Sequence, residues 1–462
     1  MPAKKVSLTA FLIFLGTFVV YASAFHNGFF WDDWIWVPWN LSLESWHGLA
    51  KIWLDPFALE VYPLTPTTFW FEYHVWGLNP FGYHLVNVLF HAANAVLVGA
   101  VLSKLGIRGA WSAAAIFAWH PVQVESVAWI AERKNVLSLF FYLLAVLSSI
   151  RFWNLDQSST NEVQPKRFYG LTLLFFLCSI LSKSIACTFP FVALILLWWK
   201  RDQIKKRDVF LLAPIFVISL VIGLMTILIE RIRIEAKGTG FAWTFWERCS
   251  IAAKAICFYI GKLFWPAQLS LVYPKWESNS HGFLFLGLFL FAVLLSIGFV
   301  KSISKNAGKG VIAAVLVFVI NAAPTLGFLN VSFFTYSFVA NWWLYLPSIS
   351  LIALFAVAWE QLWRKLGRAF VPSVLKFIAT ISILLVLSSL TVQRVLAYRD
   401  EETVWRDTVN KNPKSAWVHF NLGVTLQRNG KMFDAVKEYE ETLQFEPRHP
   451  GARNNLSLLK AQ

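Results

Sequence analysis

The chain has 462 residues, of which 57% are apolar and only 15% are charged. Soluble domains usually carry about 25% charged residues, so this composition excludes an ordinary soluble protein. The net charge is +15, but Lys and Arg stand in short clusters between apolar segments. That pattern is typical of membrane topology and excludes a nucleic-acid-binding stripe. The four cysteines form no Cys-x-x-Cys pair, so they predict neither a metal site nor a disulfide framework.

Apolar segments of spanning length follow one another from residue 6 to residue 393. A helix needs roughly 20 apolar residues to cross a bilayer, and the pattern predicts about eleven transmembrane helices. They are expected at 6–25, 83–102, 110–130, 136–152, 168–181, 188–199, 209–229, 283–300, 311–329, 338–359 and 374–392. The first segment ends in a sequence that resembles a signal-peptidase site, but its length favours retention as a span. The segment 251–265 contains two lysines and is expected to lie at the membrane interface.

The distribution of positive charge predicts the orientation. The loops on the side of the N-terminus carry more Lys and Arg than the loops on the other side, which places the N-terminus in the cytoplasm. An odd number of spans then puts the C-terminal tail on the exoplasmic side. The predicted fold is an all-α polytopic membrane bundle over residues 1–395, with a large first outer loop at 26–82, followed by a helical tail at 396–462.

The tail has the pattern of one 34-residue tetratricopeptide-type repeat (TPR) that begins at Ala416. Small and large residues stand where two antiparallel helices of such a repeat interlock, at Leu422, Gly423, Ala435, Tyr439 and Pro447. One repeat cannot bury a core alone. The tail must therefore dock on the membrane domain, on a second copy, or on a partner protein.

The first outer loop opens with two adjacent carboxylates among aromatic residues, Asp32 and Asp33. Asp is common at the start of a helix, where its side chain caps the backbone. A carboxylate in an apolar pocket just outside a membrane can instead be a general base, because burial raises its basicity. The spacing alone leaves both interpretations open.

A polar stripe runs along the predicted helix 83–102, where His84, Asn87 and His91 recur at helical spacing. Such a stripe must face the bundle or a wet cavity, as pocket residues or as partners in interhelical hydrogen bonds. His84 and His91 are about 10.5 Å apart along a helix axis, too far to share a metal ion. His120 precedes a proline, and Glu125 lies on one predicted helical face with Arg133, as an ion network or as part of a substrate site.

Cations near the predicted outer surface are suited to a lipid phosphate. They are Arg133, Lys134, Lys183 and Arg231. The inner loops are short and none has the Gly-rich signal of a nucleotide-binding turn. A transferase with this organisation must therefore use a donor that the membrane presents.

At these residues the chain resembles the transmembrane and tetratricopeptide-repeat (TMTC) proteins and their bacterial relatives. The resemblance follows in order along nearly the whole chain, and its first half is carried by Trp31-Asp32-Asp33, Tyr62-Pro63-Leu64-Thr65, Glu72-Tyr73-His74, Trp76-Gly77-Leu78-Asn79-Pro80 and Gly82-Tyr83-His84-Leu85-Val86-Asn87. It continues through His120-Pro121-Val122, Glu125-Ser126-Val127-Ala128-Trp129, Glu132-Arg133-Lys134-Asn135, Leu181-Ser182-Lys183, Leu263-Phe264-Trp265-Pro266 and Tyr345-Leu346-Pro347. Each motif alone is weak, but the ordered set is specific.

The resemblance implies a GT-C membrane glycosyltransferase related to protein O-mannosyltransferases, in a bacterial inner membrane. Such an enzyme transfers a sugar, with inversion, from a polyprenyl-phosphate lipid to an acceptor hydroxyl on a protein or glycan. The acidic residue of the first outer loop acts as base, and Asp32 and Asp33 both match that position. No cofactor is implied with certainty, and a need for a divalent cation is left open.

One departure from the family pattern favours a different function. The family pattern has an acidic residue and then a basic residue or histidine shortly before the Tyr-Leu segment, but this chain has Asn341-Trp342-Trp343 there. If those charges hold the donor phosphate, this contact is lost. The alternative is a non-catalytic membrane scaffold whose TPR tail binds a partner protein.

Overall fold

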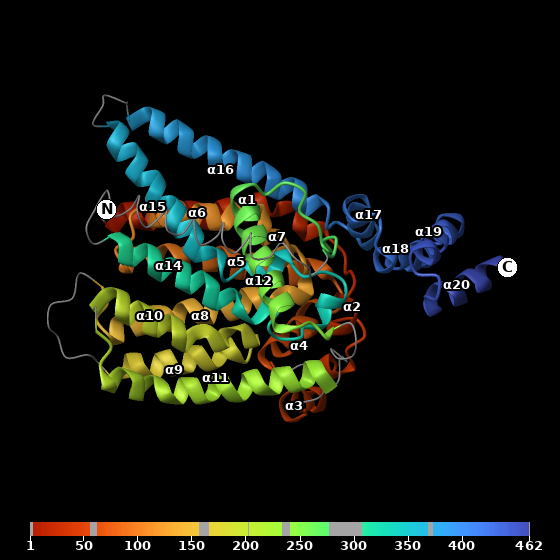
Figure 1. Cartoon of the computed structure of the whole chain (residues 1–462), viewed down its shortest axis with the longest axis horizontal. Helices are drawn as coiled ribbons and strands as arrows, with labels where there is room; N and C mark the ends of the chain where they lie inside the picture. The colour runs from red at the N-terminus through yellow and green to blue at the C-terminus, as the bar shows by residue number, and fades with distance from the viewer. Residues whose placement is uncertain are drawn as a thin grey trace.

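The computed structural model describes residues 3–55, 62–156, 166–201, 203–232, 241–276, 307–367 and 373–461. Every regular element in these residues is a helix, which confirms the predicted all-α fold. Figure 1 shows long helices side by side, with short helices and the C-terminal helices gathered at one end of the bundle. We call this end, which carries the first loop and the tail, the loop end.

Helices of the described residues overlap most of the predicted spans, although their bounds differ. They are α1 (Ala3–Val20), α5 (Pro80–Lys104), α8 (Arg133–Phe152), α9 (Arg167–Ile180), α10 (Phe189–Arg201), α11 (Lys206–Ile232), α14 (Ala307–Ala322), α15 (Ser348–Gly367) and α16 (Ser373–Leu396). Within the described residues, 6 helical segments are long and apolar enough to cross a membrane, and three shorter apolar helices accompany them. The predicted span 283–300 lies outside the described residues. The chain is thus an integral membrane protein.

The predicted span 110–130 is not one helix. Helix α6 (Ala110–Trp119) stops early, and the chain continues through η3 (Pro121–Gln123), α7 (Val124–Ala128) and η4 (Ile130–Glu132). Pro121 has no backbone N–H to continue the helix, and Nδ1 of His120 accepts the N–H of Val122 at 3.2 Å. The break brings residues 120–132 to the loop end, beside the first loop.

A second difference concerns the span expected at 338–359, which becomes helical only at Ser348 after the short turn η9 (Asn341–Leu344). The interfacial segment 251–265 belongs to a longer helix, α12 (Phe245–Phe264). This helix runs across the direction of the long helices in Figure 1. The remaining short elements are η1 (Ala22–His26), α2 (Asp33–Trp36), η2 (Leu41–Leu43), α3 (Trp46–Leu54), α4 (Leu64–Trp76), η5 (Ser184–Thr188), η7 (Ala323–Thr325) and η8 (Ser332–Thr335).

The tail consists of α17 (Glu401–Lys411), α18 (Ala416–Arg428), α19 (Met432–Phe445) and α20 (Pro450–Lys460). Helices α18 and α19 pack tightly because Gly423 faces the ring of Tyr439. A Cβ atom at Gly423 would lie 2.7 Å from that ring, so only glycine fits without a shift.

The tail packs on the membrane domain of its own chain. The N–H of Gly28 donates to the carbonyl of Arg399 at 2.9 Å. Arg394, at the end of α16, donates to the carboxylate of Asp407 on α17 at 2.6 Å. Of the three docking partners that the single repeat left open, the structure thus shows the first.

Candidate active site

The carboxylate of Asp33 links the first loop to residues 120–132, the irregular segment that follows α6. Its side chain is fully buried. One carboxylate oxygen accepts the N–H of Ala131 at 2.6 Å, and the other accepts the N–H of Phe30 at 3.2 Å. Burial raises the pKa of this carboxyl group well above its ordinary value, although the two N–H donors oppose the shift. Asp33 is therefore a buried structural residue that fixes the first loop against Ala131.

Asp32 differs from its neighbour because it is only half-buried. It stands at the first position before α2, but its side chain makes no capping hydrogen bond there. The phenol of Tyr336 lies nearby, and its pKa is raised by burial and, to a smaller degree, by the charge of Asp32. The helix-cap interpretation is not realised at Asp32, whose carboxylate lies at the rim of an aromatic cluster.

That cluster is built around Trp31. Its backbone has a φ of 47°, in the left-handed region that bulky residues rarely adopt. Its ring stacks on Trp129, with centroids 5.0 Å apart, and meets Trp405 and Trp417 of the tail edge-on at 5.8 and 5.3 Å. Tyr336 in turn stacks on Trp417 at 4.1 Å. Aromatic residues from three distant parts of the chain thus gather around the residue that precedes Asp32.

Two of the predicted cations lie beside this loop. Lys183 and Lys134 both pair with the buried carboxylate of Glu132, at 3.1 and 3.4 Å. Lys134 also lies over the ring of Trp36 in α2, 5.3 Å from its centre. Glu132 follows directly after Ala131, which holds Asp33. The structure therefore brings the two aspartates, Lys134 and Lys183 to one region of the loop end.

The other two predicted cations lie elsewhere. Arg133 is fully buried and forms a bidentate ion pair with Glu72 of α4. It also donates to the side chain of Asn87 and to the carbonyl of Tyr83. Arg231 is exposed on the last turn of α11. Within the described residues, neither guanidinium forms an ion pair with Asp32 or Asp33.

The polar stripe on α5 forms hydrogen bonds with backbone carbonyls at the end of α6 and in residues 120–132, the irregular segment that follows it. Asn87 donates to the carbonyls of Val127 and Trp129 at 3.2 and 3.1 Å. His91 bonds the carbonyl of Ala118 at 2.9 Å and the hydroxyl of Tyr345 at 2.8 Å. These contacts are those of interhelical hydrogen bonding.

The last two pocket candidates differ in their contacts. His84 is fully buried near the backbone of Asn27 and Gly28, but within the described residues neither of its ring nitrogens forms a hydrogen bond. Nε2 of His120 lies 3.0 Å from the carbonyl of Leu263. The rest of the polar stripe and His120 thus serve to hold irregular backbone inside the bundle.

Glu125 lies at the centre of a buried polar network. Its carboxylate accepts the amide of Asn341 at 2.7 Å and the guanidinium of Arg394 at 3.1 Å. Asn341 also accepts the hydroxyl of Tyr273 at 2.8 Å. The amide that departs from the family pattern is therefore fully engaged inside the protein. Within the described residues, no group of three or more His, Cys, Asp and Glu side chains is arranged to hold a metal ion.

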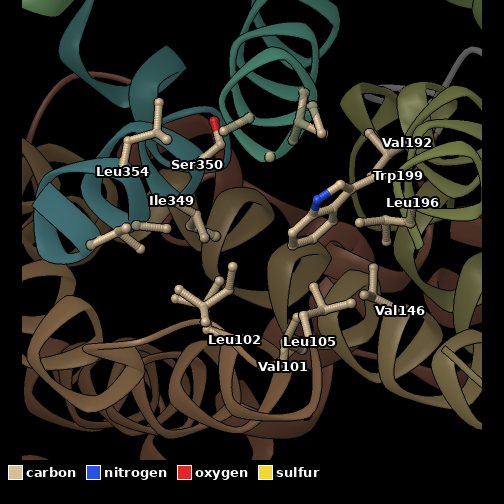
Figure 2. Close-up of a pocket in the computed structure, with 18 of the residues that line it drawn as sticks. Val101, Leu102, Leu105, Val146, Val192, Leu196, Trp199, Ile349, Ser350 and Leu354 are labelled. Carbon is tan, nitrogen blue, oxygen red and sulfur yellow. The ribbon is translucent and has the colours of Figure 1, made fainter. Parts of the chain in front are cut away.

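A cavity of about 520 Å³ lies between α5, α8, α10, α14 and α15. Figure 2 shows its apolar lining, with Val101, Leu105 and Val146 on one side, Ile349 and Leu354 on another, and the Trp199 indole extending into the space. Its lining reaches Tyr142 and Leu346, which also line a small pocket next to Lys183 and Asn135. Apolar space inside the bundle thus extends toward the cations of the loop end.

Sequence reasoning missed several residues of the site. Trp129 stands in one of the motifs that carry the resemblance, but the sequence assigned it no role. Tyr336, Trp405 and Trp417 were missed because no local pattern links them to the first loop. These features define a helical membrane protein with a carboxylate, aromatic residues and lysines gathered at one end of its bundle.

Comparison with known proteins then specifies its relatives. The chain is 26% identical to human protein O-mannosyl-transferase TMTC1 over 86% of its length and 49% of the human protein. It is 25% identical to Drosophila melanogaster Tmtc3 over 85% of the chain and 49% of that protein, and 24% identical to a protein O-mannosyl-transferase of Caenorhabditis elegans over 83% and 54%. The chain is a relative of the TMTC protein O-mannosyl-transferases, and it spans about half their length. No protein-family model and no solved structure matches it.

Proposed function

We propose that the chain is an inverting membrane glycosyltransferase of the GT-C type, which transfers a sugar from a polyprenyl-phosphate lipid to an acceptor hydroxyl. The names of its relatives favour mannose as the sugar and a protein hydroxyl as the acceptor. The observation that carries the proposal is the half-buried Asp32 at the loop end, next to Asp33, whose carboxylate binds the segment that carries Glu132 and its two lysines, Lys134 and Lys183. We place this end on the exoplasmic side, with the N-terminus in the cytoplasm.

The apolar cavity supports a lipid-linked donor. Its walls are mostly aliphatic and aromatic side chains of membrane helices, which suit a polyprenyl chain, and Arg108, Lys200 and Gln361 are among the polar residues that also line it. The lysines around Glu132 lie at the loop end of the same helices and suit the phosphate of that lipid. A donor with its chain in the bundle and its phosphate near Lys183 would present the sugar to the first loop.

Asp32 and Asp33 have separate roles in this mechanism. The carboxylate of Asp32 takes the proton of the acceptor hydroxyl, and the hydroxyl oxygen attacks the anomeric carbon from the face opposite the phosphate. The bond between that carbon and the phosphate oxygen breaks, and the lipid phosphate leaves with the bonding electrons. Lys183 and Lys134 stabilise its negative charge. Asp33 acts through the backbone, because both its oxygens hold N–H groups.

The experiment compares Asp32→Asn with Asp33→Asn in the purified full-length chain. A positioned base contributes about 10²- to 10⁴-fold to rate. Asp32→Asn should therefore lower transfer from polyprenyl-phosphate mannose to a Ser/Thr peptide by that factor and leave donor binding and thermal stability unchanged. Asp33→Asn should lower stability as well, because an amide can accept at only one of its two ends. Full activity of Asp32→Asn would rule out this mechanism.

One observation favours the scaffold as a second candidate. Asn341 is uncharged and tied to Glu125, so this position adds no positive charge for a donor phosphate. If the wild-type chain binds no polyprenyl-phosphate sugar and transfers none, the scaffold becomes the better account.

A further inference from the structure

The backbone of Trp31 is the most unusual feature of the candidate site. A left-handed backbone is unfavourable for a bulky residue and persists only where the surroundings enforce it. The residue that follows is Asp32, so the conformation of Trp31 decides where the carboxylate of Asp32 is placed. The question is which group enforces it.

The answer lies in the C-terminal tail. The N–H of Trp31 donates to the carboxylate of Glu401, the first residue of α17, at 3.3 Å. The second oxygen of Glu401 accepts the guanidinium of Arg428 at 3.0 Å. That guanidinium also lies over the ring of Trp34 in α2, 5.5 Å from its centre. Glu401 is therefore fixed between two helices of the tail and reaches into the first loop.

Further contacts between the first loop and the tail lie next to the hydrogen bond from Trp31 to Glu401. Gly28 donates to the carbonyl of Arg399, and the ring of Phe30 meets Tyr398 at 5.6 Å. Trp31 lies against Trp405 and Trp417, as described above. Each of these contacts joins the loop to a residue between 398 and 428. The tail therefore determines the conformation of the loop at residues 28–31.

We propose that Glu401 is a positioning residue of the active site, which makes α17 and α18 part of that site and not a separate binding module. Its carboxylate holds the N–H of Trp31 and thereby sets the carboxylate of Asp32 for the acceptor hydroxyl. The inference rests on the proposed function for its catalytic consequence. Its structural part, the control of the loop by Glu401, can be measured without any activity.

The test uses three variants of the full-length chain. Glu401→Ala removes the acceptor of the Trp31 N–H, whereas Glu401→Gln keeps an amide oxygen that can accept it. Glu402→Ala is the matched control, because Glu402 pairs with Arg406 and Lys431 inside the tail. It disturbs the tail at the neighbouring position without touching the loop.

Hydrogen exchange of the backbone amides gives the structural result. Glu401→Ala should raise the exchange rate of amides 33–37 about tenfold or more, as expected from loss of a hydrogen bond to a charged group. Glu401→Gln should recover most of that protection, and Glu402→Ala should loosen only the tail. The inference is overturned if Glu401→Ala leaves amides 33–37 at the wild-type rate, or if Glu402→Ala loosens them equally.

Transfer kinetics give the catalytic result. Glu401→Ala should lower kcat about tenfold or more with an unchanged KM for the lipid donor, and Glu401→Gln should restore most of it. An effect on KM alone would contradict a positioning role. If the wild-type chain transfers no sugar, the proposed function fails, while the exchange experiment still decides whether Glu401 controls the loop.

Discussion

At the scale of single residues, burial separates the predicted cations. Arg133 and Lys183 are equally basic in the sequence and both lie near the predicted outer surface. In the structure Arg133 is fully enclosed and paired with Glu72, whereas Lys183 lies with Lys134 around Glu132 next to the first loop. A loss of donor binding in a variant of Arg133 would therefore report on folding.

This difference predicts a stability effect. Arg133→Met leaves the buried carboxylate of Glu72 unpaired and should destabilise the protein by about 3–5 kcal/mol. The double variant Arg133→Met with Glu72→Leu should recover most of the loss, because neither charge then remains. Thermal unfolding in detergent measures both. Lys104→Met, which breaks the half-exposed pair with Asp156, is the control and should cost less than about 1 kcal/mol. An equal effect of Arg133→Met and Lys104→Met would contradict this account.

The sequence could identify the acidic loop but could not separate its two carboxylates. Asp32 and Asp33 are adjacent and chemically identical, so composition and spacing treat them alike. Their difference arises from Ala131, 98 positions away from Asp33, whose N–H is placed by the break after α6. A contact of that kind depends on how distant segments meet, and no local pattern encodes it.

At the scale of elements, local patterns predicted most of the helices, because apolar length and the positions of proline are local properties. The span at 110–130 shows the limit of this reasoning. The sequence shows a proline at position 121 inside this span, but it does not reveal how long the irregular segment after the proline is. That length depends on Asn87 of α5, which holds the carbonyls of Val127 and Trp129. Backbone that leaves a helix inside a membrane protein needs such partners.

The helix pair α18–α19 carries a prediction about pH. Nδ1 of His419 lies 2.6 Å from the carboxylate of Glu438, and its Nε2 lies 2.9 Å from the carbonyl of Pro413. Burial alone would lower the pKa of His419, but these partners raise it above its ordinary value of 6.5. The protonated pair should stabilise the hairpin fully below pH 6.5, and this stability should be lost as the pH rises through the raised pKa.

Hydrogen exchange of α18 and α19, corrected for the intrinsic effect of pH, measures that loss. His419→Gln removes the titrating group, and its hairpin should show the same protection in mildly acidic and in alkaline buffer. If the wild-type hairpin shows no loss of protection above the raised pKa, the pair with Glu438 does not contribute to its stability.

At the scale of the whole molecule, the proposed function assigns the apolar cavity to the lipid chain of the donor and the loop end to its phosphate. Ala314→Phe should fill part of the cavity at a cost of about 1–3 kcal/mol to an occupying chain, or about tenfold or more in its affinity. The KM for a long-chain polyprenyl-phosphate sugar should rise accordingly, and that for a short-chain analogue should not. Val217→Phe is the control, because Val217 is 60% exposed on α11. Equal effects on the KM values of both donors would mean that the polyprenyl chain does not bind in this cavity.

Which parts of the chain come together could be predicted only in outline. The repeat pattern showed that the tail needed a docking partner, but it did not select one. The choice depends on Trp31, Trp405 and Trp417, whose rings interlock across the loop and the tail. Their spacing has no period, so no repeat or helical pattern reveals it.

The bond between Trp31 and Glu401 has a consequence for the biosynthesis of the protein. The two residues are 370 positions apart in the chain. Ribosomes add roughly 5–20 residues per second, so the first loop leaves the ribosome about 20–70 s before the carboxylate that shapes it. During that interval the nascent chain is already in the membrane, where sugar lipids are present, but its Asp32 is not yet held. Under the proposed function, a chain interrupted before residue 401 would insert into the membrane but stay inactive, so the need for α17 and α18 would prevent sugar transfer by unfinished proteins.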